Sequence, residues 1–234
     1  MRACYDDAAR IARTTSTMAE RKRPRRTRER ILETSLALFN RDGEPHVTTA
    51  HVAIEMNISP GNLYYHFPNK DAIIEELYGR LEAKLLPLLT LPFDRSPGVE
   101  DLWFMLHVMF ETMGEFRFLY RDIMELTSRN RALGKRFAEL TRKGEDTVLQ
   151  LLRSLERDGA LRASEREMSA VAQNIVIVAT YWMSFHRTRN PVREGSEPDA
   201  GLVRGAHQVL ALIAPFALGE TRELIDSLGQ KYIE

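Results

Sequence analysis

The sequence lacks several features that would place it in a familiar class of protein. Among its 234 residues there is one cysteine, Cys4, which excludes an intrachain disulfide or a cysteine-based metal site and favours a reducing cytoplasm. The longest apolar-rich stretch, residues 175–185, is too short to span a bilayer, so we expect no membrane partner. High net charge and a poor apolar fraction, which are typical of disorder, are also missing, because 33 basic residues balance 33 acidic ones and 44% of the residues are apolar. A chain of this length can form one large domain or two modest ones.

Signatures of common catalytic sites are absent as well. The chain contains no glycine-rich phosphate loop, no His-Glu-x-x-His zinc helix and no Gly-x-Ser-x-Gly nucleophile elbow. His46 and His51 are five positions apart, which does not place them on one helix face as metal ligands. We therefore predict that the protein is not an enzyme and uses neither a cofactor nor a metal ion.

The net charge of zero conceals an uneven distribution. Residues 1–70 carry 12 basic and 8 acidic side chains, and residues 71–234 carry 21 and 25. Most of the basic excess lies in residues 21–30, where seven Lys or Arg residues are opposed only by Glu29. Such a run is usually a solvated face or a floppy tail, and it favours DNA binding when it precedes a DNA-reading element. Residues 1–20 are predicted to be a disordered extension, and Met18 is a second plausible start of the reading frame.

From Thr27 onward the apolar residues recur every three or four positions, which predicts an all-α chain. We expect an N-terminal part at residues 21–70 and a larger helical part at residues 71–234, with Pro87, Pro92 and Pro97 breaking the helical pattern. Four helices are expected to begin at Thr27, at Thr48 or Thr49, at Ser59-Pro60 and at Asn69. The later helices are expected at residues 99–116, 118–130, 132–157, 165–188, 200–217 and 220–231.

The two short helices between Thr48 and His66 have the spacing of a helix-turn-helix. Their turn needs a residue that tolerates a left-handed backbone, and Asn57 is one of the few non-glycine residues that does. Lys70 would add a phosphate site at the start of the next helix. The candidate DNA-binding residues combine the basic arm with the caps and polar residues of these helices: Arg25, Arg26, Arg28, Thr48, Thr49, Ser59, Gly61, Asn62, Tyr64, Tyr65, His66 and Lys70.

These residues closely resemble the TetR family of bacterial transcription regulators. The resemblance covers residues 25–75 and includes Ile31-Leu32, Ser35, Leu38-Phe39, Gly43, Val47-Thr48, Val52-Ala53, Ile58-Ser59, Gly61-Asn62-Leu63-Tyr64-Tyr65-His66-Phe67 and Asn69-Lys70. Two positions depart from the family pattern, because Asn57 replaces the usual glycine and Ala50 replaces a common basic residue. The resemblance implies a cytoplasmic homodimer that binds a palindromic operator in double-stranded DNA, in most cases as a repressor, and whose C-terminal domain binds a small effector.

The helices expected at residues 99–116 and 165–188 are apolar almost all round, which suits either an ordinary core or the wall of a pocket. The candidate effector-binding residues are their aromatic and histidine side chains, together with one tyrosine between them: Trp103, Phe104, His107, Phe110, Tyr120, Tyr181, Trp182 and Phe185. We expect a largely apolar or aromatic effector. A solid core at these residues would favour the alternative, a regulator whose C-terminal domain only dimerises or binds a protein partner.

The helix expected at residues 200–217 carries an apolar stripe beside Gly201-x-x-x-Gly205, and small residues at this spacing permit close helix approach. We therefore predict that this helix and the one at residues 165–188 form a four-helix dimer interface. The stripe consists of Val203, Ala206, Val209, Leu210 and Ile213.

Overall fold

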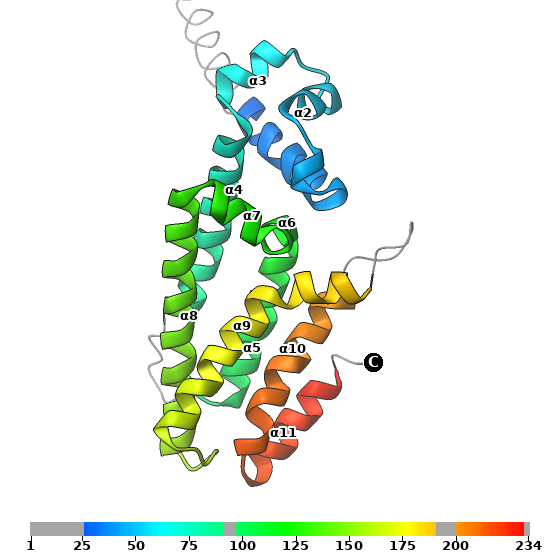
Figure 1. Cartoon of the computed structure of the whole chain (residues 1–234). Helices are drawn as coiled ribbons and strands as arrows, with labels where there is room; N and C mark the ends of the chain where they lie inside the picture. Colours follow the sequence, from blue (N-terminus) through cyan, green and yellow to red (C-terminus); the bar gives the residue numbers. More distant parts are fainter. Residues whose placement is uncertain (1–25, 91–96, 191–199, 232–234) are drawn as a thin grey trace, which may run out of the picture. The chain divides into compact units, whose positions relative to one another are not determined.

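The computed structural model describes residues 26–90, 97–190 and 200–231 (Figure 1). Regular structure in these ranges is helical, and one isolated antiparallel bridge joins Leu161 to Ala217. The all-α prediction is confirmed. The expected extension at residues 1–20 and the first half of the basic run, including Arg25, lie outside the described residues.

The chain forms two compact units, Met1–Leu77 and Tyr78–Glu234. The division falls inside a helix, α4 (Lys70–Leu88), whereas the sequence pattern places a boundary at residues 70 and 71. The residues between these two positions include Ile73, Ile74 and Leu77, which are fully or almost fully buried.

The first unit consists of a helix at residues 26–42, a 3-10 turn η1 (Glu44–His46), α2 (Thr49–Glu55), α3 (Pro60–His66) and the first two turns of α4. The first helix buries residues at spacings of three and four, and it ends where Gly43 adopts a φ of 89°. The core of this unit comprises apolar side chains of its helices, together with Val47 after η1, Met56 after α2 and Phe67 after α3: Ile31, Leu32, Leu38, Phe39, Val47, Val52, Ala53, Met56, Leu63, Phe67, Ile73, Ile74 and Leu77.

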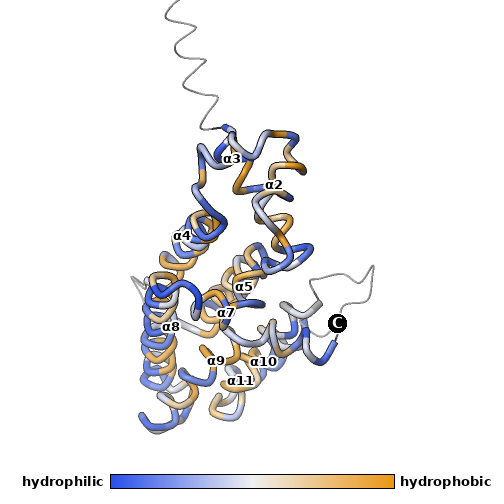
Figure 2. Tube along the Cα trace, turned by 45° about the horizontal axis from the view of Figure 1, so that its top comes forward, coloured by the Kyte–Doolittle hydropathy of each residue, from blue (hydrophilic) through white to orange (hydrophobic). Residues whose placement is uncertain are grey.

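The second unit contains the rest of α4, α5 (Val99–Glu115), α6 (Arg117–Arg121), α7 (Ile123–Arg129), α8 (Arg131–Arg157), α9 (Glu165–Arg189), α10 (Ala200–Ile213), a 3-10 turn η2 (Ala214–Phe216) and α11 (Gly219–Gln230). Helix α9 packs against both α8 and α10. Hydrophobic and hydrophilic residues alternate along α8 (Figure 2). Its apolar face joins α5, α9, α10 and α11 in one core.

Two of the expected helices are shorter than the sequence pattern indicates. The helix expected at residues 118–130 is interrupted at Asp122, whose φ of −112° and ψ of 19° separate α6 from α7. The helix expected at residues 200–217 stops at Ile213 and continues as η2, because Pro215 has no N–H to donate. Conversely, α4 passes through Pro87 before it ends at Leu88.

Within the described residues, α9 alone is long and apolar enough to cross a membrane by length and composition. Its Ala172, Ile175 and Ala179 are buried in the core that it shares with α5, α8 and α10. The core helix of a helical domain passes the same test of length and composition.

Candidate nucleic-acid interface and ligand cavity

The turn between α2 and α3 depends on a left-handed residue. Asn57 has a φ of 53°, and among the described residues it is the one non-glycine residue with positive φ. Its N–H donates to the carbonyl of Ile54 at 3.0 Å, and Ile58 N–H donates to the carbonyl of Ala53 at 3.0 Å. The prediction for Asn57 is confirmed, because an asparagine satisfies the geometry that a glycine would otherwise supply.

Side chains cap both helices of the motif. The Thr48 hydroxyl accepts from His51 N–H at 3.2 Å, and Thr48 N–H donates to His51 Nδ1 at 3.4 Å. The Ser59 hydroxyl accepts from Asn62 N–H at 3.2 Å, and Pro60 occupies the first helical position. Each hydroxyl accepts in its cap and retains a proton that it can donate to a phosphate oxygen.

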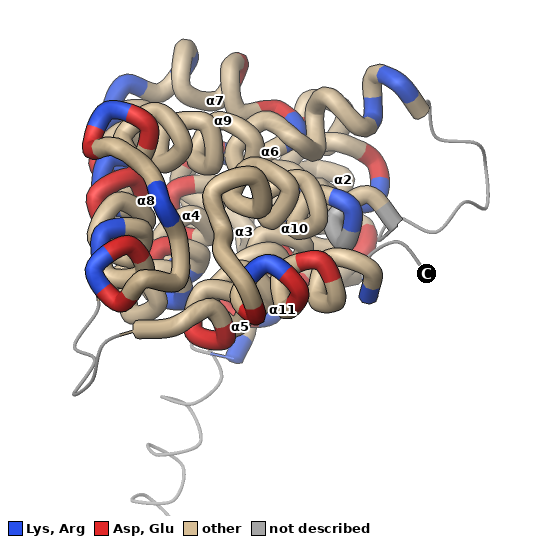
Figure 3. The backbone as a smooth tube through the Cα atoms, turned by 90° about the horizontal axis from the view of Figure 1, so that it is seen from below, with Lys and Arg blue, Asp and Glu red and all other residues tan. Residues whose placement is uncertain are grey.

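Helix α3 presents an uncharged polar face to solvent. Tyr65 is 79% exposed, and Tyr64, Gly61 and Asn62 are also exposed, whereas Leu63 is buried. Figure 3 shows that α3 carries no charged residue, while acidic and basic residues interleave along α8. The face is therefore suited to contacts through hydroxyl, amide and aromatic groups.

Two contacts set the positions of groups on this face. The Tyr64 hydroxyl lies 3.1 Å from the Thr49 hydroxyl and links α3 to α2. The Tyr65 and His66 rings meet edge to face with centroids 5.1 Å apart. A Cβ atom added at Gly61 would meet nothing within 4 Å, so the chain's own packing does not require glycine there.

One exposed residue was missed by the sequence interpretation. Ile54 on α2 is 76% exposed, although it is apolar. Its neighbours Val52, Ala53 and Met56 are buried, so Ile54 lies on the opposite side of the helix. The exposure of Ile54 could have been predicted from helical spacing in residues 49–55, because a helix that turns Val52 and Ala53 toward the core turns Ile54 toward solvent.

Arg28 has a structural contact that the sequence did not reveal. Its guanidinium donates two hydrogen bonds to the Glu76 carboxylate, at 2.9 and 3.1 Å, and lies 4.7 Å from the centroid of the Phe67 ring. The hydrogen bond to Glu76 raises the pKa of Arg28. The side chain therefore fastens the first helix to α4, and its contact with DNA stays a prediction. Arg26 is exposed.

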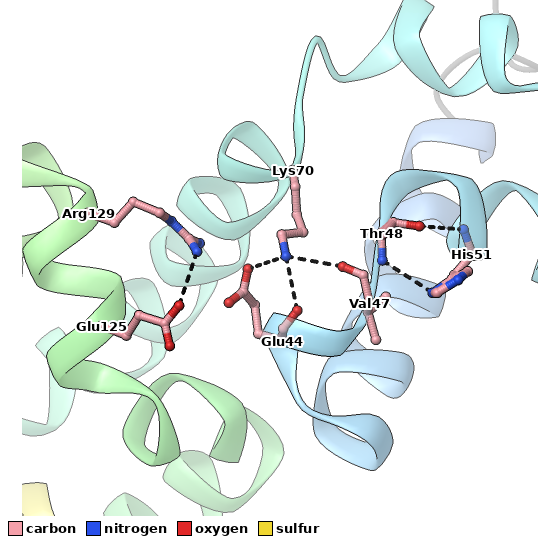
Figure 4. A network of polar contacts seen from close by, with 7 residues as sticks. All are labelled: Glu44, Val47, Thr48, His51, Lys70, Glu125 and Arg129. Atoms are coloured by element: carbon pink, nitrogen blue, oxygen red, sulfur yellow. Dashed lines mark hydrogen bonds and ion pairs between the residues drawn. The ribbon is translucent and has the colours of Figure 1, made fainter.

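The Lys70 side chain also makes its contacts within the first unit (Figure 4). Its ammonium group donates to the carbonyls of Glu44 and Val47 at 3.0 and 3.1 Å, and Nζ lies 2.7 Å from Glu44 Oε1. The Glu44 side chain is 0% exposed. Three partners occupy the three donors of the ammonium group. The structure thus gives Lys70 a role other than the expected phosphate site, because its contacts secure the turn and loop that lead into α2.

The candidate effector residues do not line one cavity. Phe104 is 59% exposed, and Tyr181 and Phe185 are about half exposed. The others separate into four environments. Trp103 stacks on His107 at 5.5 Å, Phe110 is buried in the core, and Trp182 lines an open groove with Phe185. Only Tyr120 of the candidate effector residues lines the methionine-lined cavity described below. The candidate effector residues are apolar enough to line a pocket. Their positions along the helices, however, place their side chains on different helix faces.

A partly open, methionine-lined cavity lies between α4, α5, α6, α8 and α9 of the second unit, and its volume is about 60 Å³. Three methionines, Met105, Met109 and Met113, line it from α5. An open groove of about 350 Å³ lies beside it between α7, α8 and α9. The cavity and the groove share four lining residues, Phe137, Thr141, Val176 and Thr180.

The predicted dimer stripe on α10 is corrected by burial. Ala206, Val209, Leu210 and Ile213 are no more than 1% exposed within their own unit, and the side chain of Val203 lies outside the described residues. A Cβ at Gly205 would lie 2.6 Å from Phe110 Cε1 and 2.7 Å from Trp182 Cδ1. The small residues therefore permit close approach of α10 to α5 and α9 of the same chain.

An apolar ridge remains exposed on α9. It consists of Ile177, Tyr181 and Phe185, which are spaced four residues apart and so lie on one face of the helix. Exposed apolar side chains gathered on one helix face are typical of an interaction surface.

Comparison with known proteins agrees with both units. The family described as "Bacterial regulatory proteins, tetR family" matches residues 31–77, and the TetR family described as "Bacterial transcriptional repressor" matches residues 80–225. The second match alone spans more than half of the chain.

Curated relatives include the nucleoid occlusion factor SlmA of Shewanella pealeana, which is 30% identical over 158 residues that cover 65% of this chain and 78% of the relative. The SlmA of Idiomarina loihiensis is 26% identical over 168 residues, which cover 68% of this chain and 81% of the relative.

Solved structures include a TetR-family transcriptional regulator from Marinobacter aquaeolei VT8, which is 35% identical with a TM-score of 0.79 over 88% of this chain and 98% of that one. A SmeT–triclosan complex shares the fold at 21% identity, with a TM-score of 0.53 over 83% of this chain and 93% of that one. The helix-turn-helix, the helical second unit and these matches identify the chain as a member of the TetR family, a DNA-binding transcription regulator and not an enzyme.

Proposed function

We propose that the protein is a cytoplasmic repressor that binds a palindromic operator as a homodimer and is released by a small, largely apolar effector. The observation that carries the DNA-binding part is the exposed, uncharged face of α3 on a capped helix-turn-helix. TetR-family proteins bind DNA as dimers and often bind small molecules. SmeT, which shares the fold, was solved with triclosan.

On this proposal α3 enters the major groove of the operator, and α2 crosses the DNA backbone at the edge of that groove. Asn62 and His66 read base edges, Gly61 lets the backbone approach closely, and the hydroxyls of Tyr64 and Tyr65 bind phosphate or base edges. Ile54 supplies an apolar contact from α2, of the kind that a thymine methyl group accepts. Arg26 and the basic residues before it add phosphate contacts.

Replacing Tyr65 by alanine should weaken operator binding about tenfold, in the range of 1–3 kcal/mol for a specific base contact. Stability should barely change, because the side chain is 79% exposed. Fluorescence anisotropy on a duplex from the gene's own upstream region measures the affinity. Phe104→Ala is the matched control, since it removes an aromatic side chain that is also exposed, but on the second unit. Equal affinities for the wild type and Tyr65→Ala would refute the assigned DNA-reading face.

The dimer interface is proposed to be the α9 ridge of Ile177, Tyr181 and Phe185. A second copy that places its own ridge against this one would form a two-fold interface, in which each chain uses the same surface. This replaces the predicted α10 stripe and keeps the predicted contribution of the helix at residues 165–188.

A Tyr181→Glu substitution should shift the protein from dimer to monomer at micromolar concentration, because it buries a carboxylate in the paired ridges. Sedimentation velocity measures the shift, and operator affinity should fall with it because one half-site is lost. Phe104→Glu introduces the same charge at an exposed aromatic position on α5 and should leave the dimer intact. A Tyr181→Glu protein that sediments like the wild type would place the interface elsewhere.

Release is proposed to follow a shift between two dimer geometries. Two recognition helices about 34–36 Å apart fit successive major grooves of one operator. An effector that prefers a splayed dimer lowers operator affinity, and the loss cannot exceed the ratio of its affinities for the two geometries.

A second candidate is a DNA-bound regulator whose C-terminal unit contacts a protein partner. Two observations favour it: the matched relatives include SlmA, whose name assigns it to nucleoid occlusion, and the methionine-lined cavity of the second unit has a volume of only about 60 Å³. A ligand screen scored by operator release separates the candidates, because a protein-responsive regulator would release DNA for no small molecule.

A further inference from the structure

We infer that the second unit carries a binding site for a small aromatic carboxylate, in an open groove between the C-terminal end of α9 and the N-terminal half of α10. The groove has a volume of about 440 Å³, and it shares no lining residue with the methionine-lined cavity or with the groove beside that cavity. The two helices that form it lie side by side (Figure 1). The site is thus separate from the core of the unit, and the inference does not depend on the proposed function.

The charged side chains that line the groove are all basic. Arg189 lines it from α9 and Arg204 from α10, and no Asp or Glu is among its lining residues. Both arginines are exposed, and among the described residues neither guanidinium forms an ion pair with a carboxylate. A guanidinium matches a planar carboxylate with two parallel N–H donors. The groove therefore favours an anion that the protein's own acidic side chains do not supply.

Three rings of α9 form an aromatic wall along the groove. The centroid of the Trp182 ring lies 5.7 Å from that of Phe185 and 6.1 Å from that of His186. The Arg189 guanidinium lies over the Phe185 ring, 5.6 Å from its centroid. All four side chains line the groove. An aromatic ligand can pack its ring against this wall while its carboxylate meets the guanidinium groups.

The Gly201-x-x-x-Gly205 spacing of α10 sets the positions of two of these rings. A Cβ added at Gly201 would lie 2.7 Å from His186 Nδ1, and one added at Gly205 would lie 2.7 Å from Trp182 Cδ1. Trp182 Nε1 also donates to the carbonyl of Gly201. The two glycines let both rings pack directly against the α10 backbone, so the wall is held in place before a ligand arrives.

The size of the groove suits a compact ligand. Its volume of about 440 Å³ falls within the range of roughly 300–1,000 Å³ that is typical of small-molecule sites. Together, the aromatic wall and the two guanidinium groups call for a flat apolar body with one acidic group. We therefore expect a bicyclic aromatic acid to bind more tightly than a neutral or cationic molecule of the same shape.

The groove adjoins the proposed dimer ridge at one residue, Phe185. The other two residues of the ridge, Ile177 and Tyr181, are not among the lining residues of the groove. The opposite wall belongs to α10, which the ridge does not include. The site is therefore expected to stay open in the dimer, with the ligand at the edge of the interface.

The test uses naphthoate as the probe, with titration calorimetry on the full-length protein. Naphthoate should bind, and naphthylmethanol, which has the same rings without the charge, should bind about tenfold more weakly because it cannot form charge-assisted hydrogen bonds with arginine. Naphthylmethylammonium should bind more weakly than the alcohol. Equal affinities for the acid and the alcohol, or no binding of the acid, would overturn the inference.

Arg189→Gln and Arg204→Gln should each weaken naphthoate binding about fivefold, the upper end of what an exposed ion pair contributes. Both side chains are exposed, so the variants should fold. Arg166→Gln is the matched control, because Arg166 is exposed on the same helix as Arg189 and does not line the groove. Wild-type affinity in both Arg189→Gln and Arg204→Gln, or an equal loss with Arg166→Gln, would contradict the assigned site.

Two further measurements separate this site from the dimer interface and from a protein-docking surface. Naphthoate should bind Tyr181→Glu as tightly as the wild type, and binding by this variant alone would show that a second copy covers the groove, which would overturn the inference. A peptide of Glu and Phe residues is titrated in parallel. If the peptide binds through Arg204 and naphthoate does not bind, the groove accepts a protein partner and the inference is wrong.

Discussion

Lys70→Ala is expected to destabilise the first unit by about 3 kcal/mol. The substitution leaves the fully buried Glu44 carboxylate without the ammonium group that lies 2.7 Å away, and removing one member of a buried ion pair typically costs 3–5 kcal/mol. It also removes the donor that holds the carbonyls of Glu44 and Val47. Hydrogen exchange of the amides in η1 and α2, with denaturant unfolding of the full-length protein, measures the loss.

The matched control is the double variant Lys70→Ala with Glu44→Gln. Neutralising Glu44 removes the buried charge that has lost its ammonium partner, so the double variant should recover a large part of the lost stability. A single Lys70→Ala variant with wild-type stability would show that the contact network around Lys70 does not hold the loop.

The salt dependence of DNA binding by Lys70→Met separates the structural role of this residue from a phosphate contact. Each lost phosphate contact reduces the slope of log affinity against log salt by about 0.9. Because the three donors of Lys70 are used within the protein, we expect a weaker operator complex with an unchanged slope.

Gly205→Val is the second substitution with a large expected effect, a loss of about 3 kcal/mol from the second unit. Its Cβ would be forced within 2.6–2.7 Å of the Phe110 and Trp182 rings, and relieving this overlap separates α10 from α5 and α9. Gly79→Val makes the same change within another helix, where the Cβ would meet only the flexible end of Arg136 at 3.5 Å. Thermal unfolding should show a large decrease for Gly205→Val and a small one for Gly79→Val. Equal melting temperatures for both would contradict the close approach of α10.

Local sequence patterns were sufficient to predict much of the structure of the first unit. The caps of Thr48 and Ser59 and the left-handed Asn57 each depend on residues within three or four positions, so the pattern alone predicts them. The partners of Arg28 and Lys70 lie 48 and 26 residues away, respectively, and no local pattern encodes them. The sequence therefore predicted only DNA contacts for these two side chains, whereas the structure shows their contacts within the first unit.

The second unit was less predictable for a different reason. A helical stripe such as Ala206, Val209 and Leu210 has the same spacing whether it faces its own core or a second subunit. Tyr181 and Phe185 belong to a helix that is apolar on several sides, and only the packing of α8 and α10 decides which side remains exposed. Periodicity located the helices well, but the assignment of faces required the tertiary structure.

A footprint of the wild-type protein on the gene's own upstream region, repeated over a salt series, tests the central claim most directly. The account predicts one protected site with two-fold symmetric half-sites about 10 base pairs apart, and an affinity that falls linearly on a log–log plot as salt increases. A protein that protects no symmetric site, or whose binding does not respond to salt, would contradict the assignment of α3 and the basic arm to DNA.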